Sequence, residues 1–245
     1  MLPRFFAPEL DPRQTHVQLP AEEAHHLNKV LRLAEGDAVA VFDGRGTEFS
    51  ARVESAARDA VLLRLIEQLP VPPPPAVRIV LAQAMLKGRT MEDVIRDATM
   101  MGVDAVAPLL TAHADVRIAD AKRPQLVERW QRIALASAKQ SRRATLPEVH
   151  PPRGFDEWLA APPAGILLLF VEPAAACAPR PLKHVLEFDV PARAAILIGP
   201  EGGWAKEELD RAVAHGAIVV SLGPMTLRAE SMPLAALAAL NALWA

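Results

Sequence analysis

The chain has 245 residues and a formal net charge of −2, with 51% hydrophobic and 23% charged residues. This length suits one large domain or two modest ones, and the composition is that of an ordinary globular protein. No apolar run reaches the roughly 18–20 residues of a membrane span, and the N-terminus MLPRFFAPEL lacks the apolar core of a signal peptide. The single cysteine, Cys177, excludes an internal disulfide and a cysteine-rich metal site. We therefore expect a cytoplasmic protein without a bound metal.

Residues 1–70 have the pattern of a small β-barrel. One helix is predicted over 21–32, and glycines at 36 and at 44 and 46 indicate turns. Short β-type runs occupy 16–19, 38–43, 47–55 and 60–67. Several short strands within about 70 residues are typical of a barrel, so we predict one here.

The proline-rich stretch VPPPPA at 71–76 predicts a boundary, because it can continue neither a helix nor a central strand. Strands and helices alternate after it. Strands are predicted at 77–82, 103–110, 165–171, 194–199 and 217–222. Helices are predicted from an N-cap at Thr90 to Gly102, from about Pro124, over 205–215 before Gly216, and from an N-cap at Ser231. Residues 76–245 are therefore expected to form an α/β domain with a mostly parallel sheet.

Three turns follow predicted parallel strands, namely VEP at 171–173, GPEGG at 199–203 and LGP at 222–224. Ligands of open α/β sheets bind at the carboxyl ends of the strands, and glycines let the backbone approach a ligand closely. GPEGG lacks the spacing of a GxGxxG loop and the Gly-Lys-Ser/Thr of a phosphate-binding loop. Together the turns predict a ligand pocket that is not a phosphate-binding loop. Any one of them alone could be an ordinary connecting turn without a role in binding.

Positive charge is concentrated between Lys122 and Arg143, a segment that contains seven basic residues and only one acidic residue, Glu128. The segment predicts a phosphate-contacting surface or, equally, a solvated helix face.

Longer motifs carry a family resemblance. LIGPEGGWAKEELDRA (197–212) and VSLGPMTLRAESMPLAALAAL (220–240) resemble the signature of the ribosomal RNA small subunit methyltransferase E family, of the SPOUT class. The resemblance extends along nearly the whole chain, through PRFF (3–6), HHLNKVLRLAEGD (25–37), VFDGRG (41–46), LKGRTMEDVIRDAT (86–99) and RWQRIALASAKQSRR (129–143).

This resemblance implies a PUA-like RNA-binding barrel over 1–70 and a SPOUT methyltransferase domain over 76–245 with a C-terminal trefoil knot. It also implies a homodimer that binds S-adenosylmethionine and methylates N3 of one uridine in small-subunit (16S) ribosomal RNA. The helix from Ser231 is apolar almost all round, with Leu234, Leu237, Leu240 and Trp244 at helical spacing. Such a helix is buried either in a dimer or in its own domain.

Site residues follow from the same resemblance. The cofactor pocket would be built from Leu169, Glu172, Gly199, Glu201, Gly202, Gly203, Leu222, Gly223, Pro224 and Leu227. Arg228 would stabilise negative charge on the uracil oxygens. Glu230 would orient Arg228 or accept the N3 proton, unless it is only an acid favoured by the helix dipole.

The RNA-facing candidates are Arg4, His25, His26, Arg32, Arg45, Arg142 and Arg143. Packing of the two histidines, and complementation of a helix C-terminus by Arg142 and Arg143, are the rival interpretations.

Some positions depart from the family pattern. Arginine is usual at Met225 and His113, lysine at Asp97, threonine at Ala229 and Ser231, alanine at Met232, and an acid at Met100 and Ala136. Two alternatives to the uridine methyltransferase therefore stay open. One is an RNA-binding or assembly protein without turnover, and the other is a SPOUT methyltransferase for another nucleotide.

Overall fold

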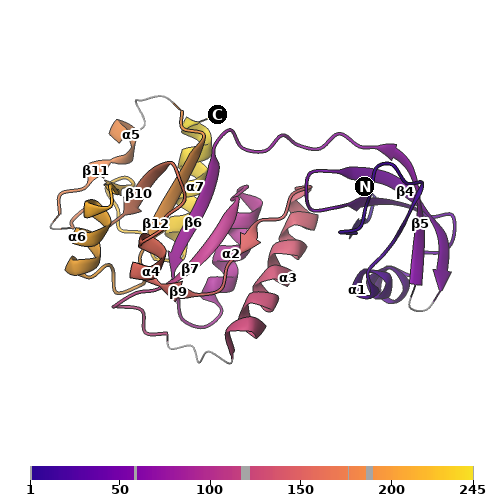
Figure 1. Ribbon diagram of the computed structural model, residues 1–245, viewed down its shortest axis with the longest axis horizontal. Coiled ribbons are helices and arrows are strands. Elements are labelled where there is room, and N and C mark those ends of the chain that lie inside the picture. Colours follow the sequence, from indigo (N-terminus) through magenta and orange to yellow (C-terminus); the bar gives the residue numbers. More distant parts are fainter. Residues whose placement is uncertain (1, 58–59, 117–121, 176, 186–189, 245) are drawn as a thin grey trace. The chain divides into compact units, whose positions relative to one another are not determined.

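The computed structural model describes residues 2–57, 60–116, 122–175, 177–185 and 190–244 (Figure 1). The chain divides into two compact units. The first contains Met1–Pro73 and Leu135–Leu146, and the second contains Pro74–Ala134 and Pro147–Ala245. Helix α3 (Arg123–Ser141) therefore contributes its beginning to the second unit and its end to the first.

The first unit is built on a curled five-stranded sheet. Its order is β1 (Arg4–Phe6), β3 (Ala38–Phe42), β4 (Glu48–Ala57), β5 (Ala60–Gln68) and β2 (His16–Gln18). Strands β1 and β3 are parallel, and the other pairs are antiparallel. Side chains that alternate inward, such as Val39, Val41 and Leu63, enclose a core with Phe5 and Leu27. The four predicted strands are confirmed, whereas the three-residue strand β1 was not predicted.

The predicted helix over 21–32 is confirmed in its extent, but its second half is a π-helix. Helix α1 (Ala21–His25) passes into a π-helix, η1 (His26–Leu31), and the chain leaves it at Arg32 with a φ of 55°. The wider turn keeps Leu27 in the core and leaves Val30 and Leu31 exposed. Hydrophobic spacing alone does not distinguish this turn from an α-helix.

The second unit contains a parallel sheet of eight strands among the described residues. The order is β11 (Arg180–Pro181), β13 (Ile218–Ser221), β10 (Ile166–Phe170), β12 (Arg193–Ile198), β6 (Arg78–Ala84), β7 (Ala105–Leu110) and β8 (Glu148–Val149), with β9 (Arg153–Gly154) also paired to β7. All of these pairs are parallel, as the alternation of strands and helices predicted.

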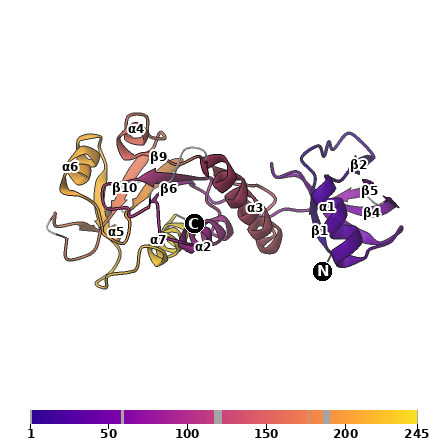
Figure 2. The ribbon, with the colours of Figure 1, turned by 90° about the horizontal axis from the view of Figure 1, so that it is seen from below.

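Helices cover both faces of this sheet, which explains the continuous apolar runs of its central strands. Helices α2 (Thr90–Met100) and α7 (Ser231–Leu243) lie on one face, and α4 (Phe155–Leu159) and α6 (Lys206–Ala214) lie on the other (Figure 2). The short helix α5 (Leu182–Val185) packs its buried side chains into the core shared with α2 and α7.

Helix ends were predicted well at glycines and less well at the caps. Gly102 and Gly216 follow α2 and α6 with φ values of 87° and 86°, a conformation that glycine adopts readily. Thr90 and Ser231 are the first helical residues rather than N-caps, and neither helix has a side-chain cap hydrogen bond within the described residues.

The final helix α7 is buried mainly in its own domain. Leu237, Leu240 and Trp244 lie in the core, and the Asn241 amide donates to the carbonyl of Met101 over 2.8 Å. Leu234 and Leu243 remain 40% and 52% exposed. In the part of the chain that is described, no helix combines the length and the apolar character needed to cross a membrane.

Candidate active site

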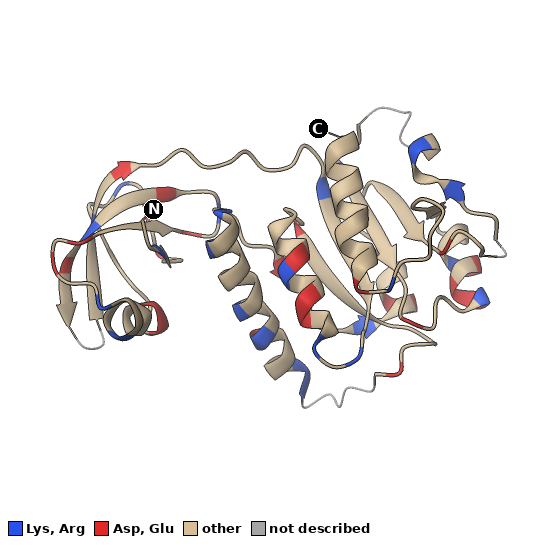
Figure 3. Ribbon diagram, turned by 180° about the vertical axis from the view of Figure 1, so that it is seen from behind, with Lys and Arg blue, Asp and Glu red and all other residues tan. Residues whose placement is uncertain are grey.

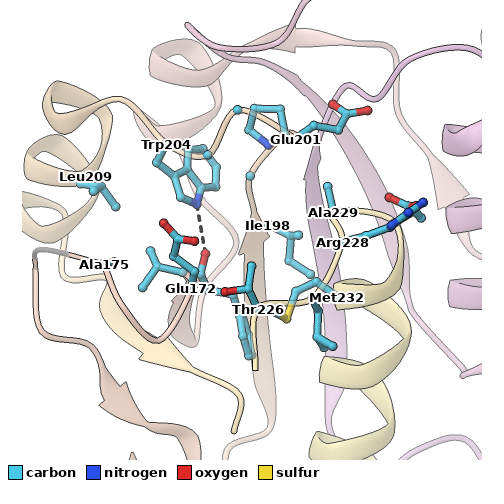
Figure 4. A pocket seen from close by; sticks show the side chains of 18 of the residues that line it. Glu172, Ala175, Ile198, Glu201, Trp204, Leu209, Thr226, Arg228, Ala229 and Met232 are labelled. Atoms are coloured by element: carbon cyan, nitrogen blue, oxygen red, sulfur yellow. Dashed lines mark hydrogen bonds and ion pairs between the residues drawn. The ribbon is translucent and has the colours of Figure 1, made fainter. Parts of the chain in front are cut away.

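A cavity of about 730 Å³ opens at the carboxyl ends of β10 and β12 (Figure 4). Its walls come from the chain after β10, from the GPEGG turn after β12, and from the stretch that leads into α7. Strand register brings these segments together, because Phe170 pairs with Ile198 on one side and Val220 on the other. The cavity therefore lies where the sequence placed the ligand pocket.

Trp204 fixes one side of the cavity. Its Nε1 donates to the carbonyl oxygen of Phe170 over 3.1 Å (Figure 4). Its ring packs against Phe155 at a centroid distance of 5.4 Å. A Cβ at Gly199 would lie 3.1 Å from that same Nε1. The turn after β12 passes the indole so closely that a side chain at residue 199 would require the ring or the turn to shift by a few tenths of an ångström.

Gly202 and Gly203 shape the rest of the turn for different reasons. Gly203 has a φ of 69°, which disfavours other residues, and a Cβ there would meet open space. Gly202 instead abuts His113, because a Cβ at position 202 would lie 3.0 Å from the His113 Cβ.

A buried glutamine supports the base of the turn. Gln83 at the end of β6 is fully buried, and its Nε2 donates to the Ala84 carbonyl over 3.0 Å. The same nitrogen lies 3.5 Å from the carbonyl oxygens of Ile198 and Gly199, where β12 ends. Its Oε1 has no hydrogen-bond partner in the described part of the chain. Sequence reasoning missed Gln83, although a glutamine inside an apolar strand is a usable signal.

The cavity is lined by apolar side chains with charged groups between them. Apolar contacts come from Phe170, Ile198, Leu209, Leu227 and Met232. The charged lining residues are Glu172, Glu201, Arg228 and Glu230.

Arg228 is held only loosely. Its side chain, labelled in Figure 4, is 86% exposed, and its Nη1 lies 3.8 Å from Glu230 Oε1. Solvent screens so exposed a pair strongly, so the guanidinium can reorient toward a ligand.

Six of the predicted cofactor residues line the cavity: Glu172, Gly199, Glu201, Gly202, Gly203 and Leu227. The predicted catalytic residues Arg228 and Glu230 line it as well. The side chain of Leu169 is buried in the core, and Leu222, Gly223 and Pro224 are not among the lining residues. The sequence also missed the lining residues Thr90, Trp204, Leu209 and Met232, which come from helices or their ends.

Arg4 has a structural role, which corrects its assignment to the RNA-facing set. Its Nε and Nη2 donate to the two carboxylate oxygens of Glu48 over 2.9 and 2.8 Å. Nη1 donates to the carbonyls of Ala138 and Lys139 in the last turns of α3. The guanidinium is buried and occupied with neutralising a carboxylate and capping a helix end, so it is not available to a phosphate.

The other RNA-facing candidates are distributed over the first unit. His25, Arg32 and Arg142 are exposed, and Arg45 is exposed beside Asp43 at 3.4 Å. His26 is half-buried against the edge of the Phe5 ring, which agrees with the packing interpretation of this histidine. The Nε of Arg143 donates to Thr145 Oγ1 over 2.9 Å.

The basic segment is partly neutralised by neighbouring acids. Lys139 Nζ donates to both carboxylate oxygens of Glu23, and Arg129 pairs with Glu92 at 2.7 Å. Lysine and arginine remain spread along α3 (Figure 3), and Arg132 and Arg142 are exposed.

Comparisons with known proteins agree with this geometry. Residues 73–241 match the family described as RNA methyltransferase domain, and residues 19–66 match the RNA methyltransferase PUA domain. The chain is 37% identical over 233 residues to the ribosomal RNA small subunit methyltransferase E of Synechocystis sp.. The aligned region covers 93% of this chain and 73% of that protein. It is 28% identical to the protein of the same name from Bacillus subtilis, over 91% of this chain and 88% of that one.

Solved structures show the same architecture. A protein from Legionella pneumophila, in complex with bound S-adenosylmethionine, superposes with a TM-score of 0.89 at 29% identity over 99% of this chain and 98% of that one. A ribosomal RNA small subunit methyltransferase E from Neisseria gonorrhoeae, bound to S-adenosyl methionine, superposes with a TM-score of 0.88 at 29% identity over 100% and 98% of the two chains. From the extent of these matches and the position of the cavity, we conclude that this chain belongs to the ribosomal RNA small subunit methyltransferase E family of RNA methyltransferases.

Proposed function

We propose that this protein transfers a methyl group from S-adenosylmethionine to N3 of one uridine in small-subunit ribosomal RNA. The observation that carries the proposal is the cavity at the ends of β10 and β12, which is lined by the GPEGG turn and by Arg228 and Glu230. Family membership supports the reaction class and the ribosomal RNA substrate. The choice of N3 rests on the resemblance of the chain to the family as a whole.

The residues of the cavity fit S-adenosylmethionine. A volume of about 730 Å³ is typical of sites for ligands of this size. Phe170, Ile198 and Leu227 offer apolar contacts to an adenine ring. The carboxylates of Glu172 and Glu201 suit a ligand that carries a sulfonium and an ammonium group. When bound, S-adenosylmethionine supplies the electrophilic methyl group.

The chain's own groups would position the uracil and stabilise its charge. Arg228 carries a fixed positive charge, which stabilises a uracil whose N3 has lost its proton. Glu230, paired with Arg228 at 3.8 Å, would orient that guanidinium or accept the N3 proton at a carboxylate oxygen. Placing N3 in line with the methyl group supplies much of the remaining acceleration.

The first domain, over 1–70, would bind the RNA, and the domain over 76–245 would carry out the chemistry. RNA contacts are proposed for His25, Arg32, Arg45, Arg142 and Arg143. Arg4 and His26 are left out, because Arg4 is bound to Glu48 and His26 packs against Phe5. A cytoplasmic location follows from this substrate.

Two finer features belong to the same proposal. The first is a homodimer, supported by Leu234 and Leu243, which leave apolar surface on the outside of α7. The second is a C-terminal trefoil knot, which rests on the resemblance of residues 197–240 to the family signature.

The proposal is tested with labelled S-adenosylmethionine and isolated small subunits from cells that lack the gene. We expect transfer to the ribosomal RNA and, after digestion, label in N3-methyluridine. Label in another nucleoside would favour a SPOUT methyltransferase of different specificity. Binding of subunits without any transfer would favour an RNA-binding or assembly protein.

A further inference from the structure

Residues 111–115, the segment that follows β7, hold the GPEGG turn from outside the cavity. None of these residues lines the cavity. The backbone N–H of Ala112 donates to Glu208 Oε1 over 2.8 Å, and His113 Nδ1 lies 3.1 Å from the carbonyl oxygen of Gly202. The segment therefore contacts both the turn and the helix that follows it.

Glu208 connects two backbone segments that are far apart in the sequence. Its Oε2 accepts the N–H of Ala205, as a glutamate in the first turn of a helix commonly does. Its other oxygen serves Ala112, and the residue is only 3% exposed. An ordinary cap needs one oxygen and no burial, so the second bond ties the start of α6 to segment 111–115.

His113 makes the corresponding contact on the turn itself. A carbonyl oxygen only accepts, so the Nδ1 of His113 carries the hydrogen and donates to Gly202. The two residues also touch closely, since a Cβ at position 202 would meet the Cβ and the carbonyl oxygen of His113 at 3.0 and 3.3 Å. The position of residue 113 thus limits where the turn can lie.

Lys87 adds an exposed tie between the same segments. Its Nζ pairs with Asp115 at 2.6 Å, and its backbone N–H lies 3.4 Å from Glu201 Oε1. The hydrogen bond between the two side chains raises the pKa of Lys87 and lowers the pKa of Asp115. Because both side chains are solvent-exposed, the Lys87–Asp115 ion pair is weaker than the buried hydrogen bonds of Glu208.

We propose that His113 and Glu208 are positioning residues for the cofactor, which act through segment 111–115 to hold the GPEGG turn in its binding conformation. The inference rests on the proposed function, because it assigns S-adenosylmethionine to this turn. Neither side chain lines the cavity, so each acts on the ligand only through the turn. A turn held before the ligand arrives binds more tightly than one that the ligand has to order.

His113→Ala tests the idea by titration calorimetry with S-adenosylmethionine and by steady-state kinetics. Loss of one hydrogen bond to the turn is expected to weaken binding by about 5- to 10-fold. The KM for S-adenosylmethionine should rise while kcat at saturating cofactor stays within about 2-fold, because His113 does not touch the reacting atoms. His113→Asn places an amide N–H near the position of Nδ1 and should restore most of the affinity.

His215→Ala is the matched control. His215 is also exposed, and its Nδ1 also contacts a backbone carbonyl, that of Arg211 at 2.9 Å, but this contact lies at the far end of α6. Its replacement should leave cofactor affinity unchanged.

Glu208→Gln supplies a second test, because an amide can accept from only one of the two backbone N–H groups. Combined with His113→Ala, it should weaken binding by less than the product of the two single effects, since both act through one segment. A parent protein that does not bind S-adenosylmethionine would contradict the proposed function. A parent that binds it, with His113→Ala binding equally well, would overturn the positioning role alone.

Discussion

Gly199→Ala is expected to disturb the cofactor pocket although it adds a single methyl group. The new Cβ would meet the Trp204 ring at 3.1 Å from Nε1 and at 3.3 Å from both Cδ1 and Cε2. Carbon contacts are most favourable at about 3.5–4.0 Å, so the ring or the turn has to move by several tenths of an ångström. The ring is fixed by its bond to the Phe170 carbonyl and by Phe155, which leaves the turn as the part that yields.

The size of the effect follows from the cost of overpacking, which is about 1–3 kcal/mol. If the turn relieves this strain by moving out of its binding position, the same free energy is lost from cofactor binding. The dissociation constant for S-adenosylmethionine should then rise by about 5- to 150-fold, since 1.4 kcal/mol corresponds to tenfold. Titration calorimetry measures the loss, and a thermal melt checks that the variant is folded.

Gly154→Ala is the control for this experiment. Gly154 has an ordinary φ of −62°, and a Cβ there would have no neighbour within 4 Å. Its replacement should not change cofactor affinity. If Gly199→Ala binds S-adenosylmethionine as tightly as the parent does, the close packing of the turn on Trp204 is not what shapes the pocket.

Three further predictions concern charged residues. Arg228→Ala should lower methyl-transfer turnover by about 10²- to 10³-fold and change cofactor affinity only a few fold, because its charge acts on the transition state; equal turnover in parent and variant would reduce Arg228 to a surface charge. Arg142→Ala should flatten the slope of log RNA affinity against log salt by about 0.7–0.9 per lost phosphate contact. An unchanged slope would mean that Arg142 is solvent-exposed and does not contact a phosphate. Arg4→Ala should destabilise the protein by about 3–5 kcal/mol in urea unfolding, because Glu48 is left buried without its partner; a loss below about 1 kcal/mol would contradict the buried pair.

Hydrophobic pattern and turn chemistry predicted most of the architecture. The alternation of strands and helices after residue 76 predicted the parallel sheet, and glycine placement predicted where α2 and α6 end. The π-helix at 26–31 was missed because it keeps Leu27 buried much as an α-helix would. Strand β1 was missed because three residues are too few to show a period.

At the site, the sequence indicated the turns but not their supports. Gly199 and Gly202 were assigned to cofactor approach, whereas in the structure they also make room for Trp204 and His113. The contact between His113 and Gly202 joins residues some 90 positions apart in the sequence, and no local pattern reports it. Arg4 was misassigned for the same reason, since its partner Glu48 is distant in the sequence.

The central claim is that this protein methylates N3 of a uridine in small-subunit ribosomal RNA. Mass spectrometry of that RNA from cells with and without the gene tests it most directly. We predict that N3-methyluridine is present in the parent strain, absent without the gene, restored by the intact chain and not restored by Arg228→Ala. The same amount of N3-methyluridine in the strain that lacks the gene would contradict the claim.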